Sequence, residues 1–173
     1  MEFVPPYPHV IPADEFVDNL IALLSDEEYQ AGALRWANGG EPLTPYVLVS
    51  ESAVWREDGE TPALLVKDVT TESREGDGLL LNRTHRFSVY QMLSGATTRE
   101  GEAMLQREAY RRATAVEMMI RGAAGSGYDL FGAAGMNADG VLIRLNYGDT
   151  MPGKASYFRF PSVDVEVPTL EGQ

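Results

Sequence analysis

The sequence predicts an α+β fold: an antiparallel or mixed β-sheet with a long helix packed on it and an N-terminal helical element. Apolar residues recur with helical spacing in some stretches, alternate with polar residues in others, and short turn sequences join the alternating stretches. The chain has 173 residues, enough to bury one sizeable core. We expect a single domain over residues 1–173, with an extended proline-rich arm at 1–12 and a long glycine-rich loop at 122–140.

The first part of the chain predicts the arm and then two helices. Prolines disfavour a helix before Asp14, and the apolar residues after it lie on one helical face, which we expect to dock within the same subunit. These residues are Phe16, Val17, Leu20, Ile21 and Leu24. Ser25 and Glu28 have the spacing of a capping box, which predicts a second helix as far as Trp36. The glycines at 39–40 are expected to end it.

The middle of the chain predicts three strands. Residues 46–49 and 63–71 are rich in Val, Leu and Thr and flank a turn-forming sequence at 57–60, so we expect an antiparallel pair. A second turn at 75–78 leads into a long strand over residues 79–93. Its alternate positions are mostly apolar: Leu81, His85, Phe87, Val89 and Leu93. We expect the three strands to form a meander.

The second half predicts the long helix and a final hairpin. Thr97 with Glu100 has the form of a capping box that opens a helix over residues 98–121. One apolar stripe marks the face expected to pack on the sheet: Leu105, Ala109, Ala113, Val116 and Ile120. Beyond the glycine-rich loop, residues 141–147 and 157–167 are typical of strands, and we expect them to pair as a hairpin.

The glycine-rich loop at 122–140 is the most informative stretch, because compact domains rarely contain so long a connection without regular periodicity. It also carries apolar residues that a plain linker lacks: Tyr128, Leu130, Phe131 and Met136. Ordering a glycine-rich backbone costs conformational entropy, so these side chains must gain contacts elsewhere. We therefore predict that they form a protein interface that orders at a boundary between subunits or with a partner protein.

The chain is acidic, with 26 Asp and Glu against 14 Lys and Arg and a formal net charge of −12. Phosphate binding requires clustered basic residues, and the densest group here is Arg107, Arg111 and Arg112. Because Glu108 and Glu117 share their helix, this group indicates an ion-pair face or a protein interface, with Arg107 and Arg111 as interface residues. We expect neither sequence-specific nucleic-acid binding nor a membrane partner, since no apolar run is long enough to span a bilayer.

The residue types that serve common catalytic and metal sites are scarce. The chain has no cysteine and two histidines, which leaves no thiolate chemistry and no multi-histidine zinc site. His85 is interpreted as a packing residue in a strand, with a general base as the alternative. Ser126 lacks the strand–turn–helix context of a nucleophile, and the glycines around it lack the lysine of a phosphate-binding loop. We expect no catalytic, cofactor-binding or metal-binding residues, and no enzyme.

Several large flexible or aromatic side chains occur at helical spacing: Trp36, Met104, Tyr110, Met118 and Met119. Such residues are typical of a core, which is our prediction, and an adaptable contact surface is the alternative. The two interpretations differ in what they require, because core residues are buried and a contact surface is exposed.

The order of these elements resembles that of the tail terminator, or tail completion, proteins of long-tailed bacteriophages. The similarity lies in the acidic N-terminal helix pair, the long hairpin, the capped helix and the alternating C-terminal segment at 162–172. The resemblance implies a structural virion protein that forms a hexameric ring on the end of the tail tube, through which DNA passes. It also implies contacts with the tail-tube protein and the head connector or completion protein, and a place at the head–tail interface of a virion assembled in the host cytoplasm.

Two other functions remain open. Another head–tail joining or tail-tube structural protein would have the same scarcity of catalytic groups, and its position in the particle would distinguish it. A small ligand-binding domain or an enzyme that uses Asp and Glu alone is the second alternative. A monomer with a saturable response to a small molecule would favour it.

Overall fold

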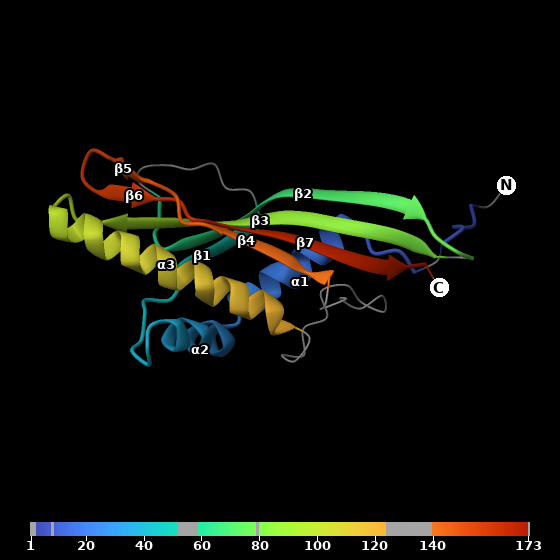
Figure 1. The fold of residues 1–173 in the computed structure, drawn as a ribbon, viewed down its shortest axis with the longest axis horizontal. Helices are drawn as coiled ribbons and strands as arrows, with labels where there is room; N and C mark the ends of the chain where they lie inside the picture. Colours follow the sequence, from blue (N-terminus) through green and yellow to red (C-terminus); the bar gives the residue numbers. More distant parts are fainter. Residues whose placement is uncertain (1–2, 8, 52–58, 79, 124–139, 173) are drawn as a thin grey trace.

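The computed structural model describes residues 3–7, 9–51, 59–78, 80–123 and 140–172, which contain three helices and seven strands. In chain order these are α1 (Ala13–Ser25), α2 (Glu27–Ala37), β1 (Leu48–Glu51), β2 (Ala63–Glu75), β3 (Leu81–Gly95), α3 (Arg99–Arg121), β4 (Leu142–Asn146), β5 (Thr150–Pro152), β6 (Tyr157–Arg159) and β7 (Ser162–Glu171). Figure 1 shows the strands as one elongated layer, with α3 running along it and α2 beside α3. The predicted α+β fold, with a long helix packed on a sheet, is confirmed.

The strands form one mixed sheet. Its main part has the order β1, β2, β3, β7, β4, and β6 pairs both with the last residues of β3 and with β5. β1 and β2 are parallel, with Leu48 opposite Ala63, so the predicted antiparallel pair and meander are wrong. The connection from Glu51 to Ala63 is longer than the tight turn that joins an antiparallel pair, and its length is compatible with parallel strands.

β2 and β3 form the long antiparallel hairpin that the sequence predicts. The register shifts between Lys67 and Thr70, where Asp68 has a φ of 56°. Asp tolerates this left-handed conformation better than most residues, and such a bulge increases the local twist of the hairpin. On β3 the alternate positions from His85 to Val89 are buried, as predicted.

The C-terminal strands are more elaborate than the predicted hairpin. β4 and β7 are antiparallel neighbours as expected, but β5 and β6 form a second hairpin between them. Arg159 holds this insertion, because its guanidinium donates to the carbonyl oxygens of Tyr147 and Gly148 at 2.8 and 2.5 Å. The predicted strand at 157–167 is therefore divided into β6 and β7 just before and after Pro161, a residue that has no N–H for a sheet ladder.

The helices match the predicted ranges closely, but both capping residues differ by one position. Ser25 is the last residue of α1, and the Asp26 side chain caps α2 by accepting a backbone N–H bond of 2.8 Å. Thr98, not Thr97, caps α3 by accepting from the Gly101 N–H at 2.9 Å. In each place two neighbouring residues are good helix caps, and the structure uses the second.

α1 and α3 pack on the same face of the sheet and build the main core with it. Phe16, Leu20 and Leu24 of α1 are fully buried, which confirms that this face docks within its own subunit. The Phe16 ring lies 5.1 Å from the Phe87 ring of β3, centroid to centroid. The predicted stripe of α3 is buried as well: Leu105, Ala109, Ala113, Val116 and Ile120. The two helices are therefore held by apolar contacts with one sheet face.

Leu20→Ala should lower the free energy of unfolding by about 3 kcal/mol, because it removes buried methyl groups and leaves a cavity that the core only partly refills. Urea denaturation of the variant and the parent chain measures the difference. Asp18→Ala, at an exposed position two residues earlier on α1, is the control and should change the stability by less than about 0.5 kcal/mol. Equal stability of the Leu20 variant and the parent would contradict the packing of α1 on the sheet.

A buried carboxylate ties the N-terminal arm to the end of the sheet. One Glu171 oxygen accepts the Ile11 N–H at 3.0 Å and an Arg83 N–H at 2.8 Å, and Arg83 also donates to the Ile11 carbonyl at 2.9 Å. The other oxygen lies 2.8 Å from His85 Nε2 and accepts from the Thr169 hydroxyl at 2.6 Å. The arm is thus fixed at Ile11 against β3 and β7.

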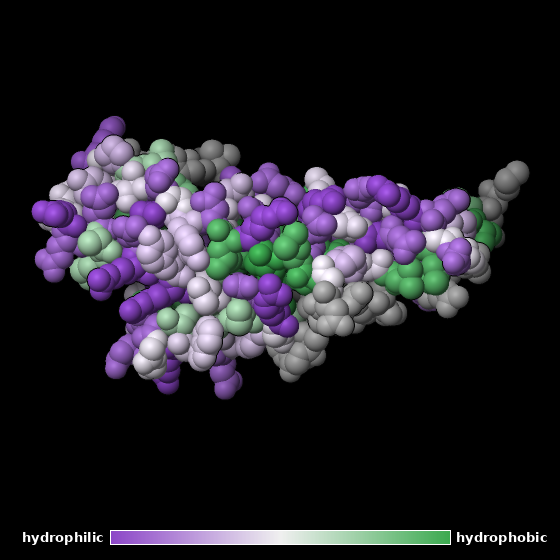
Figure 2. Space-filling view, viewed as in Figure 1, coloured by the Kyte–Doolittle hydropathy of each residue, from purple (hydrophilic) through white to green (hydrophobic). Residues whose placement is uncertain are grey.

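The sheet face that points away from the helices is polar around the middle of β3, and toward the start of β2 it carries a small apolar cluster of Ala63, Leu65 and Met92. Arg86 pairs with Glu72 at 3.3 Å and with Glu166 at 3.0 Å, and the Ser88 hydroxyl donates to Asp164 at 2.7 Å. Exposed pairs of this kind contribute little stability each. Figure 2 shows hydrophilic side chains over most of the view, with an apolar area in the middle, where α3 and the β4–β7 pair lie.

Candidate interaction surface on helices α2 and α3

α2 and α3 lie side by side and antiparallel. The Tyr29 hydroxyl donates to the Met119 carbonyl at 2.9 Å, and toward the other end of α2 Arg111 donates to the Asn38 side-chain oxygen. A β-carbon at Gly122 would lie 2.5 Å from the Tyr29 hydroxyl oxygen, so a larger residue there would displace this hydroxyl from its place beside α3. These contacts hold the two helices in a fixed relation and give them a common outer surface.

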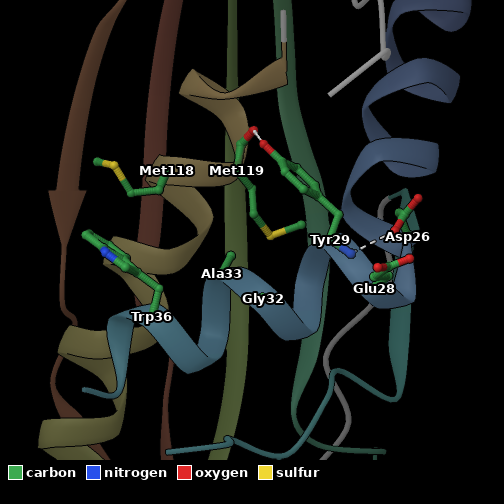
Figure 3. A pocket seen from close by; sticks show the side chains of 8 residues that line it. All are labelled: Asp26, Glu28, Tyr29, Gly32, Ala33, Trp36, Met118 and Met119. Carbon is green, nitrogen blue, oxygen red and sulfur yellow. Dashed lines mark hydrogen bonds between the residues drawn. The ribbon is translucent and has the colours of Figure 1, made fainter. Parts of the chain in front are cut away.

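An open groove of about 590 Å³ lies between the two helices. It is lined by Asp26, Glu28, Tyr29, Gly32, Ala33, Trp36, Met118 and Met119. Figure 3 shows Trp36 and Met118 at one end and Tyr29 nearer the other, where the acidic side chains of Asp26 and Glu28 lie. The groove is therefore mostly apolar, with negative charge at the end formed by the first turn of α2.

The α2 side of the groove has large side chains at its ends and small ones between them. Tyr29 and Trp36 are separated by two helical turns and so lie on the same side of α2, with Gly32 and Ala33 between them. A β-carbon added at Gly32 would have nothing within 4 Å. Trp36 is 62% exposed. This part of the groove, which we call the saddle, therefore has an aromatic side chain at each end, Tyr29 and Trp36, and an open floor at Gly32 and Ala33.

Gly32→Ala should raise the free energy of unfolding by about 0.5–1 kcal/mol, because alanine has the higher helix propensity and the added methyl group meets empty space. Thermal or urea denaturation of the subunit measures the gain. Gly101→Ala is the contrasting control, since its β-carbon would collide with the Ala96 carbonyl oxygen. A loss of stability in the Gly32 variant would show that the groove floor is occupied within the subunit.

Arg107 and Arg111, both predicted as interface residues, are exposed on α3 at the opposite end of the helix pair. They line a second hollow of about 320 Å³ together with Asn38, Leu43 and Met104. The groove, this hollow and the exposed side chains between them form what we call the α2–α3 surface. This surface is acidic at the start of α2 and basic near the end of α2. Its contact with another protein stays a prediction.

Arg112 differs from its two neighbours in sequence. It is fully buried, so the interpretation of all three arginines as one solvated or interface group is wrong for this residue. Its guanidinium donates to Glu108 at 2.6 Å and to the Thr44 carbonyl at 2.8 Å, and it lies 4.9 Å from the Tyr46 ring centroid. Burial raises the pKa of the Tyr46 phenol, although the charge of Arg112 opposes this shift. Arg112 therefore links α3 to the segment before β1.

The aromatic and methionine side chains divide between core and surface. Met119 is buried in the main core, as predicted. Trp36, Met104 and Tyr110 are exposed, so the core prediction is wrong for them and the alternative, a contact surface, describes them better. Met104 and Tyr110 fall outside the apolar stripe of α3, and Trp36 falls outside the buried face of α2, which carries Gln30 and Leu34. The remaining interface candidates lie outside the described residues: Tyr128, Leu130, Phe131 and Met136.

His85 is buried between a hydroxyl and a carboxylate. Its Nδ1 lies 3.0 Å from the Thr71 hydroxyl and its Nε2 lies 2.8 Å from Glu171, while the ring centroid is 5.8 Å from that of Phe16. A hydroxyl, an imidazole and a carboxylate in this order also occur in catalytic triads. Here the imidazole is closed off from solvent and the carboxylate is bound to Arg83 as well. We interpret the group as a structural anchor, in agreement with the predicted packing role.

Among the residues that the structure describes, no group of three or more His, Cys, Asp or Glu side chains is placed to hold a metal ion. In the same part of the chain, no helix has the length and apolar character needed to cross a membrane. No protein-family model matches the chain, and no curated protein matches it in sequence. The functional argument therefore depends on the geometry and chemistry of the α2–α3 surface.

Proposed function

We propose that the chain is a structural protein that works by self-association, with the α2–α3 surface as its main subunit contact. The observation that carries this proposal is the exposure of Trp36 at 62% and of Met104 at 64%, both on the α2–α3 surface. Aromatic and methionine side chains are enriched at the centres of protein interfaces. Large exposed apolar groups that gather on one surface indicate contact with another protein.

The charge distribution of this surface favours contact between copies. Asp26 and Glu28 lie at one end of the groove, and Arg107 and Arg111 lie at the other end of the helix pair. A head-to-tail arrangement brings the acidic end of one copy to the basic end of the next. Such heterologous contacts produce a ring when the rotation between subunits closes.

The particular role that we propose is that of a bacteriophage tail terminator: a ring that caps the tail tube, joins it to the head connector and lies at the head–tail interface of the virion. The support is the order of elements described above and the polarity of the α2–α3 surface. The acidic character of the chain, with a net charge of −12, suits a passage through which DNA moves without being held. Another head–tail joining or tail-tube protein is the alternative within the same class.

The purified chain should be an oligomer by sedimentation equilibrium and a hollow ring in negative-stain images. Trp36→Ser combined with Met104→Ser should weaken subunit association by about tenfold or more. The two parent side chains bury apolar area only when subunits associate, so their loss weakens the assembly and not the subunit fold. Leu170→Ser, at an exposed apolar position on β7, is the control and should leave the mass unchanged. A monomer at high micromolar concentration would overturn the proposal.

The groove itself supports a second candidate function. Its volume of about 590 Å³ falls in the usual range for small-molecule sites, roughly 300–1,000 Å³. A small apolar or aromatic ligand could therefore bind between Trp36 and Met118. A monomeric chain whose thermal midpoint rises saturably with such a compound, and whose Gly32→Leu variant does not respond, would favour this function over self-association.

A further inference from the structure

The N-terminal arm carries apolar side chains that its own subunit leaves in solvent. Phe3 is 82% exposed and Val4 is 77% exposed. They are followed by Pro5 and Pro6, which restrict the backbone to extended conformations of the polyproline type. A segment that is already extended loses little conformational entropy when it binds. The arm therefore has both the apolar groups and the stiffness of a recognition segment.

The arm points away from the groove of its own subunit. Ile11 is fixed at the end of β7 by Glu171 and Arg83 through both its N–H and its carbonyl. Figure 1 shows the N-terminus and the C-terminus at the same end of the molecule, whereas α2 lies beside α3 toward the other end. None of the described arm residues lines the groove. Residues 3–7 are thus placed to reach a neighbouring molecule.

We propose that residues 3–7 of one subunit dock in the α2–α3 groove of a neighbouring subunit, so that the arm of each copy binds to the next copy. This inference rests on the proposed self-association and names the segment that the groove binds. Phe3 packs against one aromatic end of the saddle, and the proline pair lies over the open floor at Gly32. The occupant is a second copy of this chain.

The chemistry of the groove fits this occupant. Proline-rich extended segments are bound by grooves lined with aromatic side chains, and here Tyr29 and Trp36 provide the aromatic ends. The missing side chain at Gly32 lets a proline ring approach the backbone of α2. Residues 3–7 carry no charged side chain, so they avoid repulsion from Asp26 and Glu28. Much of the remaining chain is acidic and would be repelled there.

Disulfide crosslinking tests the contact directly, because the chain has no cysteine of its own. Full-length Val4→Cys protein is mixed with isotopically labelled Gly32→Cys protein and mildly oxidised, and the mass of each covalent dimer identifies its two chains. A cysteine at position 32 has open space for its β-carbon. Mixed Val4–Gly32 dimers should exceed, by tenfold or more, those formed when Ala31→Cys replaces Gly32→Cys, since Ala31 is exposed on α2 but does not line this groove.

The mass of the cysteine-free parent chain separates the two possible failures. An oligomeric parent with equal crosslinking at positions 31 and 32 overturns the arm contact and leaves the proposed self-association standing. A monomeric parent overturns both. Phe3→Ser with Val4→Ser should weaken association by tenfold or more, whereas Phe3→Leu should retain it because the side chain stays apolar. Unchanged association in the double serine variant would also overturn the arm contact.

Discussion

Glu171→Ala is expected to lower the free energy of unfolding by about 3–5 kcal/mol, because it removes one partner from a buried charge network. The carboxylate binds Arg83 and Thr169 and lies 2.8 Å from His85 Nε2, with no exposed side-chain area of its own. Without it the Arg83 charge stays largely buried and loses its counter-ion. The Ile11 N–H loses its acceptor at the same time. Urea denaturation at neutral pH measures the loss.

Two control variants separate the charge from the shape of this side chain. Glu171→Gln keeps one carbonyl acceptor and should cost less, about 1–3 kcal/mol. Glu72→Ala removes an exposed carboxylate that also pairs with arginine and should change the stability by less than about 1 kcal/mol. A Glu171 variant as stable as the Glu72 variant would contradict the anchoring role.

The pH dependence of stability follows from the same contacts. Burial alone raises the pKa of Glu171, but hydrogen bonds from His85, Thr169 and the Ile11 N–H, together with the charge of Arg83, outweigh it and lower the pKa from 4.5 to about 2. A carboxylate with a lowered pKa stabilises the fold fully above its unfolded value, and this contribution is lost as the pH falls toward the folded value. The parent should therefore lose stability between about pH 4.5 and pH 2 more steeply than Glu171→Gln.

The helices could be predicted from the sequence because their apolar stripes are local patterns. The stripe from Leu105 to Ile120 identifies both the element and its buried face. The caps were displaced by one residue because Ser25 and Asp26, like Thr97 and Thr98, are neighbours with equal chemical ability to cap. A local rule cannot choose between two such residues. The choice depends on how the preceding chain enters the helix.

Strand pairing could not be predicted in the same way, because the partner of a strand lies far away in the sequence. The segment that contains β1 has the composition of a strand, but nothing in it distinguishes parallel from antiparallel pairing with β2. The β5–β6 insertion depends on Arg159, whose role in binding the Tyr147 and Gly148 carbonyls has no local sequence signal. Such errors concern connections rather than the identity of the main elements.

The candidate surface was partly visible in the sequence. Arg107 and Arg111 were predicted as interface residues and are exposed, but the saddle between Tyr29 and Trp36 was missed because Trp36 was expected in the core. The position of Trp36 around the helix axis would have predicted its exposure, because Trp36 does not lie on the same face of α2 as the buried Gln30 and Leu34. Arg112 shows the same point, because it lies three residues after Ala109 and four before Val116, on the buried stripe of α3.

Arg112→Ala is expected to lower the free energy of unfolding by about 3–5 kcal/mol. Removal of this fully buried, long side chain leaves a cavity and breaks its hydrogen bonds. The Thr44 carbonyl loses its donor from Nη2, and the Tyr46 ring loses the cation that lies 4.9 Å from its centroid. Glu108, whose side chain is 33% exposed, regains water and limits the loss. Urea denaturation measures the change.

Arg112→Met distinguishes the volume of the side chain from its charge. Methionine fills most of the same space, and replacing a buried ion pair by an apolar side chain is often neutral or stabilising. The Nη1 atom of Arg112 has no hydrogen-bond partner among the described residues, so part of the guanidinium's desolvation is uncompensated in the parent. We therefore expect Arg112→Met to change the stability by less than about 1.5 kcal/mol. A loss as large as that of Arg112→Ala would show instead that the link from α3 to Thr44 and Tyr46 depends on the charge.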